Sequence, residues 1–287
     1  MAMRFDVLTL FPEIIKSYSK ESIIGNALNE ALIEIHSHNP RDYSLDKHKK
    51  VDDTPYGGGA GMLLQIQPFL DCFLDVSRQS ETSLANLKLE DYYPESVGNF
   101  VSPHSVQRDY EVIMFSPRGE RFNQNLAHDF ASKEQLIMLC GRYEGFDERL
   151  RNIVTKEISL GDFVLTGGEL PALTVIDAVT RILPDVLGDK YSVIAESFNS
   201  ALDILEISLD EFTKAEKKNL LNALQVFGVN DLSELSSIQL IEYPHYTRPA
   251  DYRTYKVPEI LCSGDHKKIA LWRLIEAFRI TYKICSR

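Results

Sequence analysis

The chain has 287 residues, 44% of them hydrophobic and 25% charged, and a formal net charge of −11 at pH 7. This length and composition predict a globular protein with a full core, built as one large or two modest domains. No apolar run approaches the roughly 20 residues that span a bilayer, no signal peptide is recognisable, and the four scattered cysteines form no Cys-x-x-Cys pair. We therefore expect a cytoplasmic protein with no membrane segment, no disulfide framework and no zinc site.

In chain order, the first expected elements are a strand and helical segments. Residues 4–10 read as a strand with apolar and polar side chains, and Pro12 is well placed to begin a helix. Apolar residues from Ile24 to Leu32 recur at i, i+4 and i+8, which predicts an amphipathic helix face. A second strand is expected at residues 33–36.

A glycine-rich stretch, Gly57–Gly61, must form a loop, and residues from Leu63 onward are expected to form a helix. The loop is not a P-loop, because Met62 and Leu63 replace the lysine and the hydroxyl of that motif. Taken alone, a flexible loop and a ligand contact remain equally open readings.

Three short apolar runs lie at residues 112–115, 136–140 and 163–165, and each leads into a loop marked by Gly or Pro. Continuous apolar runs of this length predict strands buried on both faces, and hence a parallel sheet covered by helices. Open α/β sheets bind ligands beyond the carboxyl ends of their strands, so the three loops are expected to converge on one pocket. The Gly167-Gly168 pair is the clearest of these loop signals, although a lone glycine pair is more often a tight turn.

The rest of the chain is expected to be largely helical. Helices are predicted at residues 170–183 and 266–283, and helical patterning also appears at 209–227. We predict a first domain at residues 1–190 with a surface insertion at 79–109, an interdomain linker with an acidic insertion at 191–240, and a small helical domain at 241–287.

Charge is distributed unevenly along the chain. Residues 79–111 hold six acids and two basic residues, and residues 201–240 hold seven acids and three lysines, a net of −4 in each segment. Residues 241–287 hold nine Lys or Arg and five acids, a net of +4. Because local charge decides whether a surface can meet phosphates, the acidic total does not exclude a nucleic-acid partner.

Two further motifs have both a structural and a functional interpretation. Gly141–Arg149 fits a solvated helix start with charge pairs, or a loop that presents amides and Glu144 to a polar ligand. Tyr243–Pro249 fits a rigid turn with an aromatic plug, or a surface that stacks on bases and binds phosphates. The histidines form no metal-binding spacing, so no metal ligand can be named.

In combination, four blocks resemble bacterial tRNA (guanine-N1)-methyltransferase, a family of the SPOUT class of knotted methyltransferases. The blocks follow the family's order and are residues 52–59, 141–145, 161–171 and 244–249. The resemblance implies an α/β fold, with a parallel sheet, helices on both faces and a deep trefoil knot, followed by a small helical C-terminal domain. Relative to the family, the linker insertion and the short C-terminus are expected to be departures.

The resemblance also implies a reaction and its partners. A methyl group would pass from S-adenosylmethionine, leaving S-adenosylhomocysteine, to N1 of the guanine immediately 3′ of the tRNA anticodon. The protein would be a homodimer with active sites at the interface, and the family's reaction is generally assisted by Mg²⁺.

The residues implied to hold the cofactor come from the three loops. They are Met114, Phe115, Ser116, Pro117, Gly141, Tyr143, Glu144, Gly145, Leu160, Gly161, Asp162, Phe163, Val164, Leu165, Gly167, Gly168 and Pro171. The residues implied to contact tRNA are Gly58, Gly59, His245 and Arg248, and the helical domain at residues 241–287 is predicted to bind tRNA.

The chemistry requires a base and a cation. Guanine N1 carries a proton that a base must remove, and negative charge then builds on O6. By resemblance, Arg181 would neutralise the O6 charge and Glu196, in place of the family's aspartate before Ser-Phe, would be the base. Asp203 and Glu242 are alternative bases.

Two other functions remain open. The chain could be a SPOUT methyltransferase with another target, such as a ribose 2′-hydroxyl, or a non-catalytic RNA-binding module. The presence of Arg181 and of a carboxylate at position 196 favours an enzyme.

Overall fold

The computed structural model describes residues 2–86, 108–188 and 196–285. The chain divides into two compact units, Met1–Leu187 and Gly188–Arg287, which we call the first and second units. The predicted surface insertion at 79–109 lies largely outside the described residues.

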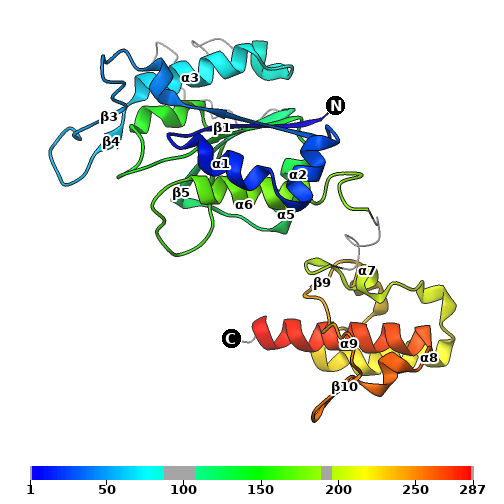
Figure 1. The fold of residues 1–287 in the computed structure, drawn as a ribbon. Helices are drawn as coiled ribbons and strands as arrows, with labels where there is room; N and C mark the ends of the chain where they lie inside the picture. Colours follow the sequence, from blue (N-terminus) through cyan, green and yellow to red (C-terminus); the bar gives the residue numbers. More distant parts are fainter. Residues whose placement is uncertain (1, 87–107, 189–195, 286–287) are drawn as a thin grey trace. The chain divides into compact units, whose positions relative to one another are not determined.

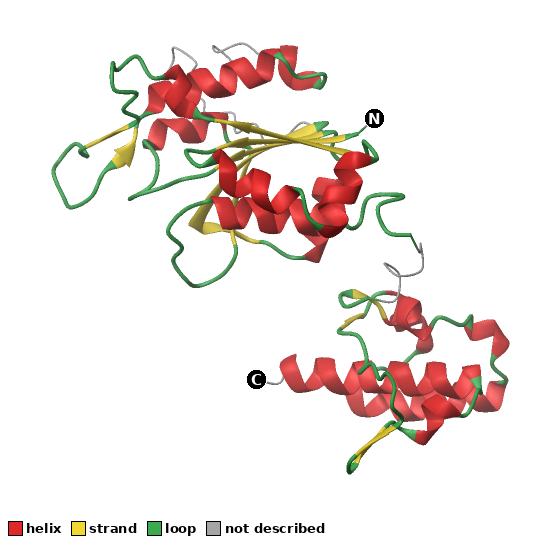
Figure 2. Ribbon diagram, in the orientation of Figure 1, coloured by secondary structure: helices red, strands yellow, loops and turns green. Residues whose placement is uncertain are grey.

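The first unit is built on a five-stranded sheet, in which every pairing is parallel, in the order β2-β1-β6-β5-β7 (Figures 1 and 2). The strands are β1 (Met3–Leu8), β2 (Ile33–His38), β5 (Tyr110–Arg121), β6 (Gln135–Leu139) and β7 (Lys156–Ser159). Successive side chains of β6 enter opposite cores, Leu136 and Met138 on one face and Ile137 and Leu139 on the other. Burial on both faces explains why residues 136–139 of this strand are all apolar, and the parallel pairing confirms the predicted sheet.

Helices cover both faces of the sheet (Figure 2). One core is closed by α1 (Pro12–Ser19), α2 (Ser22–Asn29), α5 (Gln124–Ala131) and α6 (Glu169–Thr180). The other is closed by α3 (Ile66–Arg78) and the 3₁₀ helix η4 (Glu148–Ile153). Shorter elements of this unit are η1 (Pro40–Tyr43), β3 (Asp52–Asp53), β4 (Leu63–Leu64) and η2 (Ser83–Asn86).

Two local predictions for the first unit are wrong. The helix expected from Leu63 begins at Ile66, because Leu63 and Leu64 pair with Asp53 and Asp52 in a short hairpin. The strand expected at residues 163–165 is a loop whose side chains are exposed, Val164 to 88%. The third strand of the site is instead β7, which ends four residues earlier.

The second unit is a helical body around α9 (His266–Cys285), which packs against α7 (Ala201–Leu205) and α8 (Lys214–Leu224) (Figure 1). Its core includes Leu205, Leu224 and Leu274. The remaining elements are β8 (Asn199–Ser200), η5 (Leu209–Glu211), η6 (Gln225–Phe227), η7 (Leu232–Ser236), β9 (Gln239–Leu240), β10 (Asp251–Tyr252), β11 (Tyr255–Lys256) and η8 (Glu259–Cys262).

The boundary of the second unit differs from the prediction. Residues 201–240, expected in an interdomain linker, supply α7, α8 and much of the core that closes on α9. Their acidic side chains are partly used at helix starts, where Asp203 and Glu216 complete capping boxes with Ser200 and Thr213. Among the described residues, no helix is long and apolar enough to cross a membrane.

The packing of α9 predicts where the second unit is sensitive. Leu274 is fully buried, whereas Leu202 on α7 is partly exposed. Leu274→Ala should lower the free energy of unfolding by roughly 2–5 kcal/mol, and the matched change Leu202→Ala by no more than about 0.5–1 kcal/mol. Denaturant unfolding followed by the fluorescence of Trp272, the only tryptophan, measures both. Equal losses would contradict this core.

Candidate functional site

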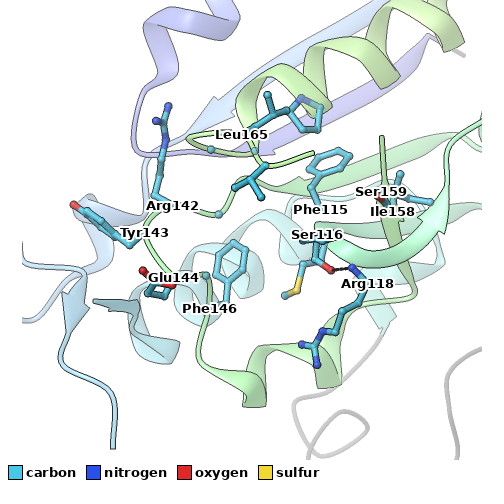
Figure 3. Close-up of a pocket in the computed structure, with 18 of the residues that line it drawn as sticks. Phe115, Ser116, Arg118, Arg142, Tyr143, Glu144, Phe146, Ile158, Ser159 and Leu165 are labelled. Carbon is cyan, nitrogen blue, oxygen red and sulfur yellow. Dashed lines mark hydrogen bonds between the residues drawn. The ribbon is translucent and has the colours of Figure 1, made fainter. Parts of the chain in front are cut away.

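A cavity of about 580 Å³ opens at the carboxyl ends of β6 and β7 and at a bulge in β5, the strand between them (Figure 3). It is lined by residues 114–118 of β5, the loop 141–145 after β6, and the loop 160–168 after β7, apart from Asp162. We call these the first, second and third loops. Every residue expected to hold the cofactor lines this cavity except Asp162, whose carboxylate pairs with Arg121. The expected convergence of the loops is therefore present.

The first loop is a bulge within β5. Phe115 and Glu120 both pair with Ile158 of β7, so residues 116–119 loop out of the ladder. Gly119 makes this possible, because a Cβ there would lie 2.5 Å from the Ile158 backbone. The bulge turns Ser116 and Pro117 into the cavity wall.

Two charged side chains outside the first loop, those of Glu157 and Arg151, hold it in place through Ser116. The Ser116 hydroxyl donates to Glu157, which also receives two bonds from Arg151, one of them 2.8 Å long. Burial alone would raise the pKa of Glu157, but the bonds from Arg151 and Ser116 outweigh burial and hold that pKa below its usual range. Glu157 therefore fixes the first loop as an ionised group.

The second loop turns through left-handed backbone at Tyr143 (φ 58°) and Gly145 (φ 108°). At position 141 a Cβ would lie 3.0 Å from the ring of Phe146, so a larger residue would require that ring to shift by a few tenths of an ångström. Phe146 packs edge-to-face on Phe69, with ring centroids 5.0 Å apart, which anchors the loop to the core.

The third loop returns from β7 to the end of β6. The amide of Gly168 donates to the carbonyl of Gly141 at 2.9 Å, and a Cβ on Gly168 would lie 2.6 Å from the Cα of Cys140. Gly167 is as tight, because a Cβ there would lie 2.3 Å from Nε of Arg142. Gly168 is thus required by the close approach of two backbone segments, and Gly167 by the side chains of Arg142 and Glu169.

A buried pair joins these loops to the first strand. The carboxylate of Glu169, only 2% exposed, lies 2.8 Å from the guanidinium of Arg142 and accepts a bond from the hydroxyl of Thr9 at 2.7 Å. Arg142 also donates to the carbonyl of Thr166 at 3.1 Å and lies over the ring of Phe11. One guanidinium therefore holds the second and third loops together.

Sequence reasoning did not select Arg142, Glu169 or Thr9 as site residues. Arg142 stood inside a recognised block, but its partner is 27 positions later and Thr9 is farther away in sequence. Arg118, Phe146 and other unselected residues also line the cavity. Only the fold brings these groups together, so spacing carried no signal for them.

The glycine-rich loop lies beside the cavity. The amide of Glu144 donates to the carbonyl of Met62, and a Cβ on Gly61 would lie 2.5 Å from Cγ of Glu144. Gly58 and Gly59, which are expected to contact tRNA, lie exposed on the same loop in left-handed backbone.

The remaining predicted residues are divided between the two units. Arg181 follows α6 in the first unit and is half-buried. Glu196, His245 and Arg248 lie in the second unit, where His245 is 3.1 Å from the carboxylate of Glu242. Arg181 therefore belongs to the first unit and Glu196 to the second.

The first unit thus defines an α/β ligand-binding protein, whose cavity lies where three neighbouring parallel strands end. A family model described as tRNA (Guanine-1)-methyltransferase TrmD matches residues 3–89, 93–227 and 229–285. A tRNA (guanine-N(1)-)-methyltransferase of Lactiplantibacillus plantarum is 42% identical over 98% of this chain and 88% of its own length. Its counterpart in Clostridioides difficile is 42% identical over 97% of this chain and 94% of its own length.

A solved structure agrees with these matches. The tRNA (m1G37) methyltransferase from Aquifex aeolicus superposes with a TM-score of 0.63 and 33% identity, over 100% of this chain and 94% of that one. The chain belongs to the tRNA (guanine-1)-methyltransferase family, a family of enzymes with the SPOUT fold. The family match runs through most of residues 201–240, so the acidic segment is not an addition to the family pattern.

The close contact at Gly168 predicts a sensitive position in the cavity wall. Gly168→Ala should lower the free energy of unfolding by roughly 1–3 kcal/mol, because the added methyl group meets backbone that cannot move freely. Gly188→Ala is the matched control, since no described atom lies within 4 Å of its Cβ position. Thermal unfolding of both variants measures the difference; a Gly168 variant as stable as the control would contradict the observed packing.

Proposed function

We propose that this enzyme transfers the methyl group of S-adenosylmethionine to N1 of the guanine immediately 3′ of the tRNA anticodon, and that the cavity of the first unit holds the methyl donor. The observation that carries the proposal is the convergence of three loops, from adjacent strand ends, on one glycine-lined cavity. Family membership supports both the reaction and the use of this methyl donor.

The cavity fits a folded nucleoside cofactor. A volume of about 580 Å³ is within the range of small-molecule sites, roughly 300–1,000 Å³. Glycines at positions 141, 167 and 168 leave backbone amides and carbonyls on the wall in place of side chains. The carboxylate of Glu144 on the rim would suit the positively charged end of the cofactor.

S-adenosylmethionine supplies a methyl group already activated on a sulfonium. The protein therefore has to align this methyl group with guanine N1 and to remove the proton that N1 carries. The three loops would orient the methyl group toward the guanine. Glu196 would take the proton from guanine N1, and Arg181 would stabilise the negative charge that develops on O6.

The resemblance, which places the base directly before Ser197-Phe198, favours Glu196 over Asp203 and Glu242, and all three residues have interaction partners in the structure. Asp203 is engaged with the hydroxyl and the amide of Ser200 at the start of α7. Glu242 pairs with His245, and its amide donates to the hydroxyl of Ser197. Glu196 lies in a turn just before Phe198, whose backbone is left-handed (φ 73°), a conformation that non-glycine residues rarely adopt.

A magnesium requirement has no counterpart among the described side chains. They include no group of three or more His, Cys, Asp or Glu residues placed to hold an ion. We therefore assign no metal ligand and no step to a metal. Assays with Mg²⁺ and with a chelator would show whether the reaction depends on the ion.

The target atom separates this proposal from the alternative within the class. A ribose 2′-hydroxyl also needs a base, but it develops no O6 charge for Arg181 to meet. Mass spectrometry of nucleosides from methylated tRNA distinguishes the two products: 1-methylguanosine supports the proposal, and a 2′-O-methylnucleoside contradicts it. Absence of any methyl transfer would favour a non-catalytic RNA-binding module.

The proposal includes a homodimer, which an exposed apolar surface beside the cavity supports. This surface comprises Phe11, Ile14 and Tyr18 from α1 and the turn before it, with Val164 and Leu170. The hydroxyl of Tyr18 donates to Asp177, which holds α1 against α6. Large exposed apolar side chains on neighbouring elements indicate an interface, and we propose a second copy of the chain as its occupant.

The role of Glu196 leads to a specific prediction. Glu196→Gln should retain affinity for S-adenosylmethionine but lose about 10²- to 10⁴-fold in methyl transfer, because the amide cannot accept the N1 proton. Single-turnover transfer of radiolabelled methyl groups and calorimetric cofactor titration measure the two properties. Glu242→Gln is the matched control and should keep near-normal turnover. The reverse result would assign the base to Glu242.

The proposed interface leads to another prediction. Leu170→Asp should shift the protein from dimer to monomer in sedimentation velocity and reduce methyl transfer, because a charge would enter an apolar interface. Val226→Asp places the same charge on an exposed apolar position of the second unit and should leave the dimer intact. A dimer that tolerates aspartate at position 170 would exclude this surface as the interface.

A further inference from the structure

A continuous exposed segment of the second unit begins with the predicted tRNA contacts His245 and Arg248 and continues into residues to which no role has been assigned. Every residue from His245 to Lys256 is exposed, and we call this segment the aromatic ribbon. Its first end is anchored to the body of the unit. Just before it, Tyr243 is buried and its hydroxyl donates to Glu206 at 3.1 Å, and the ring of Tyr246 lies 6.3 Å from that of Trp272 on α9. The amide of Val257 donates to the carbonyl of Ala250, which closes the hairpin at the other end of the ribbon.

The tip of the ribbon is the hairpin formed by β10 and β11. Tyr252 and Tyr255 are directly opposite each other in the register, so they project from the same face of the hairpin. They are 58% and 77% exposed. The guanidinium of Arg253 lies 5.4 Å from the ring centroid of Tyr252, which places a cation beside the same aromatic face.

The backbone of Arg253 has a left-handed φ of 61°. An arginine pays a conformational cost there that a glycine would avoid. Such strain is retained where a side chain has a use, and here the side chain is a cation at the tip of an exposed hairpin.

Composition indicates the chemistry of the partner. The ribbon holds three tyrosines, two arginines and a lysine against one acid, Asp251, and its only aliphatic residues are Pro249 and Ala250. Protein interfaces of the kind proposed for α1 and α6 use aliphatic groups such as Ile14 and Leu170. Aromatic rings interleaved with cations, without aliphatic side chains, suit bases and phosphates.

We propose that the hairpin Asp251–Lys256 is a base-stacking surface, on which Tyr252 and Tyr255 stack with unpaired nucleotides of the tRNA substrate. Arg253 and Lys256 pair with the neighbouring phosphates. The inference rests on the proposed function for the identity of the RNA. It extends that function by assigning to the hairpin a contact with single-stranded nucleotides.

The test measures binding of the full-length protein to a tRNA transcript with guanine 3′ of its anticodon, and to a fully paired RNA duplex of similar length. Tyr255→Ala and Tyr252→Ala should each weaken tRNA binding about tenfold, the expected loss for one stacked base. Tyr→Phe at either position should restore affinity, because the ring remains. Affinity for the duplex should be unchanged by all four substitutions, since its bases are not free to stack.

The cations have a different signature. Arg253→Gly and Lys256→Ala should weaken binding to both RNAs and reduce the slope of log K against log salt by about one each. Arg253→Gly suits the left-handed backbone at this position, and thermal unfolding of the variant should show a folded protein, so that loss of binding reports the missing cation. Lys218→Ala on α8 removes an exposed lysine from the acidic segment and should leave both the affinity and the slope unchanged.

The outcomes separate this inference from the function on which it rests. If the wild-type protein neither binds nor methylates the transcript, the proposed function fails. If it does both and the alanine variants bind as well as the phenylalanine variants, the base-stacking surface is refuted. If the tyrosine variants change the sedimentation of the protein while tRNA affinity is retained, the hairpin is an interface between copies, which also overturns the proposal.

Discussion

The ion pair between Arg142 and Glu169 is the interaction on which the cavity depends. The buried carboxylate of Glu169 needs a paired cation, which the half-buried guanidinium of Arg142 supplies, and the hydroxyl of Thr9 and the carbonyl of Thr166 add one hydrogen bond to each partner. Because these partners come from β1, the second loop, the third loop and α6, the pair fixes four segments at one point. Two of these segments, the second and third loops, line the cavity, so the ion pair sets the distance between two of its walls.

The close backbone contacts of the third loop depend on the same pair. Gly167 lies against Arg142, and Gly168 against Cys140, at distances that leave no space for a Cβ. The chain must therefore pass from the outer strand β7 to the end of β6 through a narrow passage before it enters α6. Such a return path is consistent with the knot that the SPOUT fold implies. It also explains why Gly167 and Gly168 present backbone to the cavity.

Sequence reasoning could predict the strands that are buried on both faces, because such burial requires a continuous run of apolar residues. β5 and β6 are apolar because both faces are covered, so their loops could be located. Sequence reasoning missed β7 because this strand contains the charged residues Lys156 and Glu157. In the structure they pair with Glu120 and Arg151, but in the sequence they interrupt the apolar run by which a buried strand is recognised. The exposed apolar residues at 163–165 were mistaken for that strand. Long-range pairs, above all Arg142 with Glu169, have no spacing that a single sequence reveals.

The pair also joins the cavity to the surface of α1. Thr9 bonds to Glu169 and also accepts from the amide of Phe11, and the ring of Phe11 lies 4.5 Å from the guanidinium of Arg142. α1 begins at the next residue, Pro12, and carries part of the exposed apolar surface. A displacement of α1 would therefore move the partners of Arg142, and through Thr166 the third loop. Packing on this surface and the shape of the cavity are consequently linked by a few short contacts. If Arg142 moved without Glu169, the buried carboxylate would be left without its cation, which is energetically costly.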